Sequence, residues 1–410
     1  MDVFSLNCVL FGKKRLPCYR FFEKIVKLRF LLVSCPKFQP FSSMPREPIF
    51  TSQNPEEEPL PSEKGNSSLI PQTESGTSTE EDKLLRPQRM FEMVGQREVY
   101  ERIEIAVHAA RKRGEPLGHI LFDGPPGLGK TTFATCIPRE LGVSVQIGNG
   151  ATLKAPKDVV PYLTNAEEGS VLFIDEIHRM QKTVEEFLYP AMEDFRIDLT
   201  LGEGVNARTL NIQLKPFTLI GATTRTGLIS PPLRDRFQMR EHLDFYTDEE
   251  LAEIIRRNAG KLNVEISNDA AMEIAKRSRG TPRLANNRLR WVRDYTDAKA
   301  DGTISLRIAQ AALKMQGIDE LGLDPQDRKY LETILRVFNG GPVGVESVAY
   351  TINLAPDTLI DEVEPFLLRS ELVIRTPRGR RLTEKGFRHL GADPAKYGDN
   401  SFFSFFRDEQ

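Results

Sequence analysis

The sequence reads His-Ile-Leu-Phe-Asp-Gly-Pro-Pro-Gly-Leu-Gly-Lys-Thr-Thr over residues 119–132. The part from Gly124 to Thr131 matches the pattern G-x-x-x-x-G-K-[ST] in full. Its glycines allow backbone N–H groups to turn inward around phosphate oxygens, and the helix that follows presents its N-terminus to the same anion. The stretch therefore predicts a phosphate-binding loop between a strand and a helix. In such a loop Lys130 reaches the β- and γ-phosphates, and the Thr131 hydroxyl holds Mg²⁺.

A second motif, Val171-Leu-Phe-Ile-Asp-Glu176, is a run of apolar residues that ends in two acids. A continuous apolar run is typical of a buried parallel strand, and ligands gather at the carboxyl ends of such strands. We expect Asp175 to hold Mg²⁺, directly or through water, and Glu176 to orient or deprotonate the attacking water. Taken alone, the motif also fits a strand followed by a solvated acidic turn. The phosphate-binding loop upstream favours the nucleotide site.

Two further segments place hydroxyl and cationic groups after apolar residues. Phe217-Thr-Leu-Ile-Gly-Ala-Thr-Thr-Arg225 is typical of a strand, and Thr224 at its end is placed to report the γ-phosphate. Pro232-Leu-Arg-Asp-Arg-Phe237 follows, and arginine is the residue type that can stabilise developing phosphoryl charge in a neighbouring subunit. The alternative for this second segment is a surface ion pair of one of its two arginines with Asp235.

Residues 197–214 predict a β-hairpin with one apolar face. Apolar residues occupy alternate positions on both sides of a glycine-containing turn: Ile197, Leu199, Leu201, Leu210, Ile212 and Leu214. Such a face is expected either to contact a partner or to pack on its own domain.

The second half of the chain predicts a helical unit and then a basic unit. From Thr247 the apolar spacing becomes helical, and Thr281-Pro-Arg283 opens one helix near a domain junction, where Arg283 can meet the nucleotide. In residues 318–391, helical stretches precede a short hairpin. Between residues 369 and 388 there are seven basic and two acidic side chains. Such a hairpin suits contact with a phosphate backbone, although a merely solvated hairpin is the alternative.

The composition is that of an ordinary globular chain. The 410 residues are 40% hydrophobic and 28% charged, which suggests two to four domains and excludes collagen, a coiled coil and a wholly disordered chain. The net charge of −2 requires any nucleic-acid partner to meet a local basic patch. No apolar run of roughly 18 residues exists, so no membrane span is expected. The four cysteines lack metal-ligand spacing, which predicts no zinc site and a cytoplasmic location.

The N-terminal segment differs from the rest of the chain. Residues 1–43 contain eight basic and two acidic side chains, whereas residues 45–82 contain nine acids and two bases among many Pro, Ser and Thr. The acidic stretch predicts disorder, and the whole of 1–84 is expected to be a disordered extension. The basic stretch does not fit a signal peptide. Translation that starts at Met44 is the alternative to a start at Met1.

From Leu85 to Gly391 the chain resembles the RuvB family of bacterial Holliday-junction branch-migration motors. The resemblance rests on long strings in a fixed order: LRP, GPPGLGKTT, LFIDEIHR, LYPAMEDF, TLIGATTR, PLRDRF, RGTPR and RTPRGR. It implies an α/β fold, with an AAA+ P-loop NTPase domain, a helical lid and a C-terminal winged-helix domain. The implied parts are a disordered extension (1–84), a large ATPase domain (85–246), a small helical lid (247–317), a winged-helix head (318–391) and a tail (392–410).

The resemblance also implies a function. Members of the family are ATP-dependent DNA motors that form a homohexameric ring around duplex DNA and drive branch migration of Holliday junctions in recombination and repair. ATP and Mg²⁺ are the implied cofactors. RuvA, bound through the hairpin at 197–214, and the RuvC resolvase are the implied protein partners. The alternatives are another AAA+ ATPase, such as a clamp-loader relative, and a winged-helix DNA-binding protein that uses ATP only to assemble.

Site residues follow from the resemblance by position. Mg²⁺ ligands would be Thr131 and Asp175. Catalytic residues would be Lys130, Asp175, Glu176, Thr224 (sensor 1), Arg236 (the trans arginine finger) and Arg283 (sensor 2). Nucleotide contacts would come from Leu85, Arg86, Gly127, Lys130, Thr131, Thr132, Glu193, Asp194, Phe195, Arg236, Tyr246 and Arg283, where Phe195 replaces a Tyr often found in the family. DNA contacts would come from Arg375, Arg378 and Arg380 in the wing.

The chain departs from the family pattern without losing a catalytic side chain. Pro138 falls inside the helix after the phosphate loop and is expected to kink or shorten it. Gln238 stands where the family usually has Gly, and a basic helical run is altered to Asn-Asn-Arg-Leu-Arg-Trp at 286–291. The tail after Gly391, with four phenylalanines at 402–406, has no counterpart. It is expected to dock on the body of the protein or on a partner.

Overall fold

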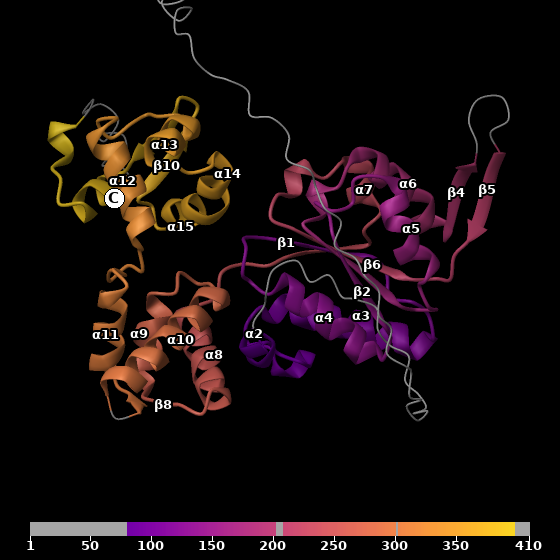
Figure 1. Ribbon diagram of the computed structural model, residues 1–410, viewed down its shortest axis with the longest axis horizontal. Coiled ribbons are helices and arrows are strands. Elements are labelled where there is room, and N and C mark those ends of the chain that lie inside the picture. The colour runs from indigo at the N-terminus through magenta and orange to yellow at the C-terminus, as the bar shows by residue number, and fades with distance from the viewer. Residues whose placement is uncertain (1–79, 202–207, 301, 398–410) are drawn as a thin grey trace, which may run out of the picture. The chain divides into compact units, whose positions relative to one another are not determined.

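The computed structural model describes residues 80–201, 208–300 and 302–397 (Figure 1). Two expectations, the disorder of residues 1–79 and the docking of the phenylalanines at 402–406, fall outside these ranges. The expected disordered extension includes residues 80–84, and here the prediction is wrong: these residues belong to a helix, α2 (Glu80–Leu85).

Helix α2 forms because its acids find cationic partners. Asp82 Oδ1 lies 2.6 Å from Arg290 Nη1, and Glu81 Oε1 lies 3.2 Å from Arg293 Nη1. The side chain of Leu85 at its end is 2% exposed. In the sequence these acids look like the end of an acidic tail. Their arginine partners lie far along the chain, so the sequence pattern does not reveal the pairing.

A five-stranded parallel sheet with the strand order β2-β3-β6-β1-β7 forms the centre of the α/β domain (Figure 1). Asp123 is paired in register with Thr223, and Asn149 with Asp175. The carboxyl ends of the three central strands therefore lie side by side at one edge of the sheet. The strands are β1 (Ile120–Asp123), β2 (Val145–Asn149), β3 (Val171–Asp175), β6 (Thr218–Thr223) and β7 (Met239–His242).

Helices cover both faces of this sheet (Figure 1). Alternate strand residues enter two separate apolar clusters: Phe122 and Phe173 face α3 and α4, whereas Leu121 and Leu172 face α5, α6 and α7. This alternation is expected of strands that are buried on both faces. The α/β domain contains η1 (Met90–Glu92), α3 (Arg97–Arg113), α4 (Lys130–Leu141), α5 (Pro156–Thr164), η2 (Ile177–Arg179), α6 (Lys182–Glu193), η4 (Thr226–Leu228) and α7 (Pro231–Asp235).

Helix α4 continues beyond Pro138 for three more residues. It ends at Leu141, and Gly142 follows in the left-handed conformation that commonly terminates helices. The side chain of Pro138 is buried in the last turn of the helix. The helix is 12 residues long and starts at Lys130, so its first turn belongs to the phosphate-binding loop.

The buried His119 connects β1, β6 and the end of α6. The backbone N–H of Leu219 donates to His119 Nδ1 at 2.9 Å, so the proton is on Nε2, which donates to Met192 O at 3.0 Å. The neutral imidazole satisfies both partners. Burial lowers the pKa of His119, because the charged form is poorly solvated there.

Acid is therefore expected to weaken the α/β domain through His119. Its pKa lies below the unfolded value near 6.5, so below about pH 6.5 the unfolded chain binds a proton that the folded chain does not. The free energy of unfolding therefore decreases as the pH is lowered through this range, by at most about 1.4 kcal/mol per pH unit for this group. The drop in Tm between about pH 7.5 and about pH 5.5 should be smaller in His119→Gln than in the wild type. An equal drop would contradict the assignment.

Strands β4 (Arg196–Leu201) and β5 (Arg208–Gln213) form the predicted antiparallel hairpin, which Figure 1 shows extending beyond α5 and α6. Ile197 pairs with Ile212 and Leu199 with Leu210, so the apolar residues share one face, as predicted. At the base Ile197 is fully buried, whereas Leu210 is 48% exposed. The base therefore packs on its own domain, and the exposed apolar surface lies further along the hairpin.

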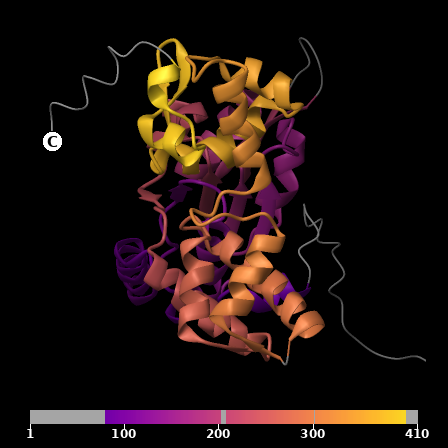
Figure 2. The ribbon, with the colours of Figure 1, turned by 90° about the vertical axis from the view of Figure 1, so that its left-hand side faces the viewer.

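The lid is a group of four helices that pack side by side (Figure 2). The Thr247 hydroxyl accepts the N–H of Glu250, while the Glu250 carboxylate accepts the N–H of Thr247, which starts the first helix with a capping box. The elements are α8 (Asp248–Lys261), β8 (Glu265–Ile266), α9 (Asn268–Lys276), α10 (Pro282–Lys299), β9 (Thr303–Ile304) and α11 (Leu306–Met315).

The head has the helices and the basic hairpin of a winged-helix domain. Its antiparallel wing pairs Val373 with Leu382 and Thr376 with Gly379. Tyr397, after the last helix, stacks on Phe387 with ring centroids 5.8 Å apart, so the start of the C-terminal tail packs on the head. The elements are α12 (Pro325–Arg336), α13 (Val345–Ile352), α14 (Pro356–Thr358), η5 (Leu359–Val363), α15 (Glu364–Arg369), β10 (Val373–Thr376), β11 (Gly379–Leu382), α16 (Glu384–His389) and η6 (Pro394–Lys396).

Within residues 80–201, 208–300 and 302–397, we find no helix whose length and hydropathy would allow it to cross a bilayer.

Candidate nucleotide-binding site

The phosphate-binding loop joins β1 to α4 and needs glycine at its close approaches. Gly124 has φ +134°, and a Cβ there would lie 2.4 Å from the carbonyl oxygen of Leu243. Gly127 has φ +80°, and a Cβ there would lie 2.8 Å from Thr281 Cγ2 and 2.9 Å from Arg283 Cβ. The loop therefore contacts the first turn of α10, and this contact brings Arg283 of the lid beside the phosphate loop.

Lys130 projects from the first turn of α4 back into the loop. Its Nζ donates to the carbonyl oxygens of Gly124 at 2.6 Å and Pro125 at 2.7 Å, and the residue is only 6% exposed. Burial lowers the pKa of Lys130, while the nearby carboxylates, led by Glu176 and Asp175, oppose this shift. A desolvated ammonium inside a loop of backbone N–H groups is suited to bind a polyphosphate.

Asp175 and Thr131 place two oxygen ligands together at the end of β3. The Thr131 hydroxyl lies close enough to the Asp175 carboxylate to help lower its pKa, and Glu176 N donates to Asp175 Oδ1 at 3.0 Å. Burial raises the pKa of Asp175. This rise is opposed by the hydrogen bond from the Glu176 N–H and by the positive charges of Lys130 and Arg86. A carboxylate beside a hydroxyl is a donor set that fits Mg²⁺, with phosphate and water completing the coordination.

Glu176 follows Asp175 in a left-handed backbone conformation, with φ 49°. Non-glycine residues in this region are strained and cluster at functional sites. The Thr224 hydroxyl, from the end of β6, donates to Glu176 Oε2 at 3.4 Å. Burial, followed by the charge of Asp175, raises the pKa of Glu176. The end of β6 and the end of β3 thus bring Thr224 and Glu176 together, beside Lys130 and Asp175.

His178 also belongs to this group, although no pattern in the sequence singles it out as a site residue. Its Nδ1 lies 2.9 Å from Thr223 Oγ1 and 3.2 Å from Glu176 Oε2. Burial, then the charge of Arg225, lowers the pKa of His178. The available signal was its position two residues after Glu176 in the string LFIDEIHR.

Arg225, directly after Thr224, connects this edge of the sheet to the head. Its Nε and Nη2 donate to the two carboxylate oxygens of Asp361 at 2.8 and 2.6 Å, and Nη2 donates to Asp357 at 2.9 Å. These hydrogen bonds raise the pKa of Arg225, and the charge of Asp361 contributes to the raised pKa of Glu176. The sequence gives no sign of this contact, because its partners are more than 100 residues apart.

Tyr246 lies against the phosphate loop on the lid side. Tyr246 is 7% exposed; its N–H donates to Gly280 O at 2.9 Å, and its hydroxyl donates to Leu128 O at 3.2 Å. Leu85 is buried, and Arg86 is close enough to Asp175 for its charge to affect that carboxyl. Thr132 follows in the first turn of α4, where its carbonyl accepts the Thr135 hydroxyl at 3.0 Å.

Arg236 is not brought together with the phosphate loop. At the end of α7, its Nη1 donates to Pro232 O at 2.7 Å and its Nη2 lies 3.1 Å from Glu193 Oε1. The predicted alternative, an ion pair with Asp235, is wrong: Asp235 pairs with Arg240 at 2.9 Å, and Arg236 with Glu193 instead.

Glu193, Asp194 and Phe195 end α6 beside Arg236. Glu193 and Asp194 are exposed, whereas the ring of Phe195 packs edge-on against Phe217, with centroids 5.9 Å apart. The predicted site residues therefore form two groups, one around Lys130 and one around Arg236.

The three wing arginines have different surroundings. Glu364 at the start of α15 is fully buried; Arg380 Nε donates to its Oε1 at 2.8 Å and Arg375 Nη2 to its Oε2 at 2.5 Å. Burial alone would raise the pKa of Glu364, but hydrogen bonds from Arg380, Tyr330 and Arg375 outweigh burial and lower the pKa. Arg378 lies exposed in the turn of the wing. Arg375 remains 47% exposed, whereas Arg380 is 18% exposed.

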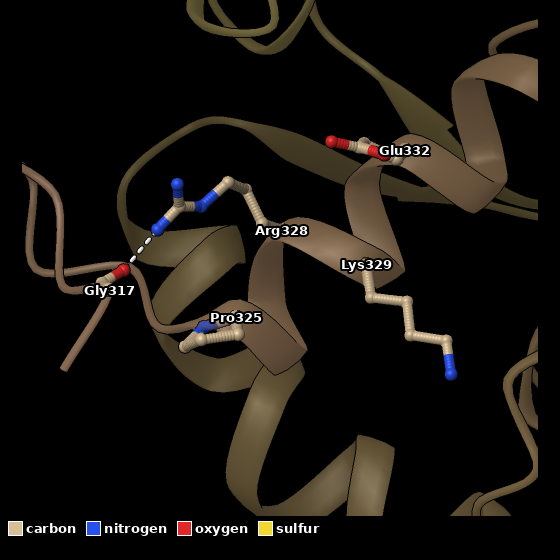
Figure 3. Close-up of a pocket in the computed structure, with 5 residues that line it drawn as sticks. All are labelled: Gly317, Pro325, Arg328, Lys329 and Glu332. Carbon is tan, nitrogen blue, oxygen red and sulfur yellow. Dashed lines mark hydrogen bonds between the residues drawn. The ribbon is translucent and has the colours of Figure 1, made fainter.

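A separate hollow of about 290 Å³ lies where the chain enters α12 (Figure 3). It is lined by Gly317, Pro325, Arg328, Lys329 and Glu332, and an Arg328 Nη2 donates to the carbonyl oxygen of Gly317. Neither group of predicted nucleotide residues contributes to it.

The parallel sheet, the phosphate loop with its Lys130–Asp175–Glu176 edge and the lid contact define a P-loop domain of the AAA+ class, here joined to a winged-helix domain. Family models match three consecutive segments: the Holliday junction DNA helicase RuvB P-loop domain over residues 85–243, the RuvB AAA lid domain over 246–319 and the RuvB C-terminal winged helix domain over 320–391. The chain belongs to the RuvB family.

Individual relatives support this assignment. The chain is 61% identical over 351 residues to the Holliday junction branch migration complex subunit RuvB of Rhodopirellula baltica. The matched region covers 85% of this chain and 96% of that protein. Among solved structures, the Thermotoga maritima RuvB Holliday junction branch migration motor is 46% identical with a TM-score of 0.69, covering 76% of this chain and 99% of that one. A lysine-to-arginine variant of it gives 46% identity and a TM-score of 0.71, covering 75% and 99%.

Proposed function

We propose that this protein is an ATP-driven DNA motor that moves Holliday junctions by branch migration. The proposal rests on the observation that the predicted site residues lie in two separate groups. Lys130, Asp175, Glu176 and Thr224 converge on one edge of the sheet, whereas Arg236 is held elsewhere by α6 and α7. An ATPase site that lacks its arginine is completed by a neighbouring subunit, so hydrolysis depends on ring assembly.

Hydrolysis would be an in-line attack of water on the γ-phosphate. Backbone N–H groups of the loop and the Lys130 ammonium bind the phosphates, and the Thr131 hydroxyl and the Asp175 carboxylate would hold Mg²⁺. Bound there, Mg²⁺ supplies positive charge that neutralises the phosphate oxygens. Glu176 orients the water and accepts its proton. Burial and the charge of Asp175 raise the pKa of Glu176, which favours uptake of a proton by this carboxylate.

The remaining site residues are assigned to nucleotide binding and sensing. Thr224, hydrogen-bonded to Glu176, acts as sensor 1, and Arg283, beside Gly127, acts as sensor 2. Leu85, Arg86, Tyr246 and Thr132 bind the nucleotide in the same subunit. Arg236, together with Glu193, Asp194 and Phe195, approaches the nucleotide of the neighbouring subunit in a homohexameric ring.

DNA and protein partners are assigned to the head and to the hairpin. The wing, with Arg375, Arg378 and Arg380, contacts the DNA backbone without reading sequence. The exposed apolar residues of the β4–β5 hairpin, such as Leu210, bind RuvA, and RuvC joins in the resolving complex. We assign the protein to the cytoplasm, as the sequence predicts.

Wing substitutions are expected to separate DNA binding from stability. Arg378→Ala should weaken duplex binding, reduce the salt dependence of binding by about one counterion and leave unfolding unchanged, because Arg378 is exposed. Arg380→Ala should destabilise the head by about 1–3 kcal/mol, because the buried Glu364 loses the hydrogen bonds from Arg380 and keeps only those from Arg375 and Tyr330. Binding titrations across salt concentrations, with thermal unfolding of both variants, test this. Equal destabilisation by both changes would contradict it.

Steady-state phosphate release tests whether the protein is a motor. A motor turns over many ATP molecules per subunit, and duplex DNA should stimulate that turnover. A protein that uses ATP only to assemble would release at most one phosphate per subunit, and this result would overturn the proposal.

A further inference from the structure

The guanidinium of Arg236 lies over the face of a tyrosine ring. Its central carbon is 4.2 Å from the ring centroid of Tyr189, which projects from α6. At this distance a cation is attracted to the negative face of the ring, and the planar guanidinium also stacks on it. The hydrogen bond from Arg236 Nη1 to Pro232 O, at 2.7 Å, fixes the rotation of the group over the ring.

The ring itself is held by a chain of hydrogen bonds. The Tyr189 hydroxyl lies 3.2 Å from Ser230 Oγ, and Ser230 Oγ donates to Glu185 Oε2 at 2.5 Å. Glu185 is 5% exposed, and Ser230 is the N-cap of α7, where its Oγ also accepts the N–H of Leu233. Helix α7 is therefore tied to α6 at both ends: at its start through Ser230, and at its end through Arg236 on the Tyr189 ring.

The remaining contact of the Arg236 guanidinium is exchangeable. Nη2 lies 3.1 Å from Glu193, whose side chain is 56% exposed. Ion pairs with exposed carboxylates contribute little free energy, so a phosphate oxygen can replace Glu193 at small cost. The ring and the Pro232 carbonyl lie on other sides of the guanidinium and do not have to be given up.

We propose that Tyr189 is a positioning residue for Arg236: it holds the guanidinium in the orientation in which it meets the γ-phosphate of the neighbouring subunit. This inference rests on the proposed trans role of Arg236. A free arginine side chain samples many rotamers, and a stacked, hydrogen-bonded guanidinium has lost much of that conformational entropy before the phosphate arrives. The contribution of Tyr189 is this preorganisation.

The first test compares Tyr189→Leu with the conservative Tyr189→Phe. Tyr189→Leu removes the aromatic face and should lower the kcat for ATP about tenfold, which corresponds to a stacking energy of about 1.4 kcal/mol, while the KM for ATP changes little. Tyr189→Phe keeps the face and should retain most of the rate. If Tyr189→Leu does not assemble, Tyr189→Met, which also lacks the aromatic face but has a more flexible side chain, should lower kcat in the same direction. Unchanged kcat in the assembled variant would overturn the proposal.

Mixed rings test whether the defect acts across the subunit boundary. A Tyr189→Leu subunit has an intact nucleotide site and a misplaced arginine; a Glu176→Gln subunit has an inactive site and a well-placed arginine. Mixing the two should give more turnover than the sum of the separate rings, because Glu176→Gln subunits complete the Tyr189→Leu sites. A folding defect would not be rescued in this way, and a merely additive rate would overturn the role of Tyr189.

A parallel mixture of Arg236→Ala with Glu176→Gln keeps the two proposals distinguishable. A gain in this mixture and none with Tyr189→Leu would refute the positioning role alone. No gain in either mixture would refute the trans role of Arg236, and the positioning role with it.

Discussion

Replacing Arg236 with alanine is expected to leave ATP binding intact and to lower turnover by about 10³-fold or more. ATP binding should persist because the contacts of Arg236 are with Pro232, Glu193 and Tyr189 on the α6–α7 edge, away from the phosphate loop of its own subunit. Turnover should fall because an arginine that arrives from the neighbour neutralises charge on the γ-phosphate only as the reaction proceeds. Nucleotide binding and steady-state phosphate release, measured on the assembled ring, check both parts.

Arg240→Ala is the matched control for this prediction. Arg240 is also an arginine at this edge, where it is half-exposed and paired with Asp235. Its substitution changes the net charge by the same amount as Arg236→Ala. It should retain turnover close to the wild-type rate. Rapid hydrolysis by isolated monomers, or equal losses in the two variants, would contradict the trans role.

Replacing Lys130 with alanine is expected to abolish hydrolysis and to weaken nucleotide binding strongly. The Lys130 ammonium is the buried cation inside the phosphate loop, and its removal leaves the phosphate charge opposed mainly by backbone dipoles. Binding of a fluorescent ATP analogue and phosphate release give the two measurements. The exposed Lys112→Ala on α3 is the control, and it should retain both activities.

Stability distinguishes a specific loss in Lys130→Ala from an unfolded protein. Burial lowers the pKa of Lys130, which means that the folded chain holds its charge at a cost. Lys130 also donates to two loop carbonyl oxygens, so the loss of these bonds offsets that cost, and we expect Lys130→Ala to unfold close to the wild-type temperature. An inactive variant that also unfolds much earlier would indicate that Lys130 supports the fold rather than the nucleotide.

Much of the α/β domain follows from local sequence patterns. The apolar runs at 171–175 and 218–223 form β3 and β6, and the glycine-rich stretch between β1 and α4 forms the loop that the motif predicts. The alternating residues of the hairpin share one face, as their period predicts. These features depend on neighbours along the chain, and for that reason periodicity and spacing reveal them.

Contacts between distant residues were not predictable in the same way. Arg225 meets Asp361 across more than 100 residues, and Arg236 finds the ring of Tyr189 through the packing of two helices. In the wing, the sequence showed only a cluster of positive charge. The buried Glu364 that engages Arg375 and Arg380 became visible once the fold had brought it to the hairpin. A charged residue in the sequence indicates which groups it can bind, but its role becomes clear only when the fold shows which group it contacts.

The measurement that tests the central claim most directly is ATP-dependent migration of a synthetic four-way junction. It should be run with and without a RuvA partner, with Lys130→Ala as the inactive control. We predict that strand products form with ATP and intact Lys130, that RuvA increases their rate, and that the control yields none. Vigorous DNA-stimulated ATP hydrolysis without strand products would contradict the branch-migration assignment.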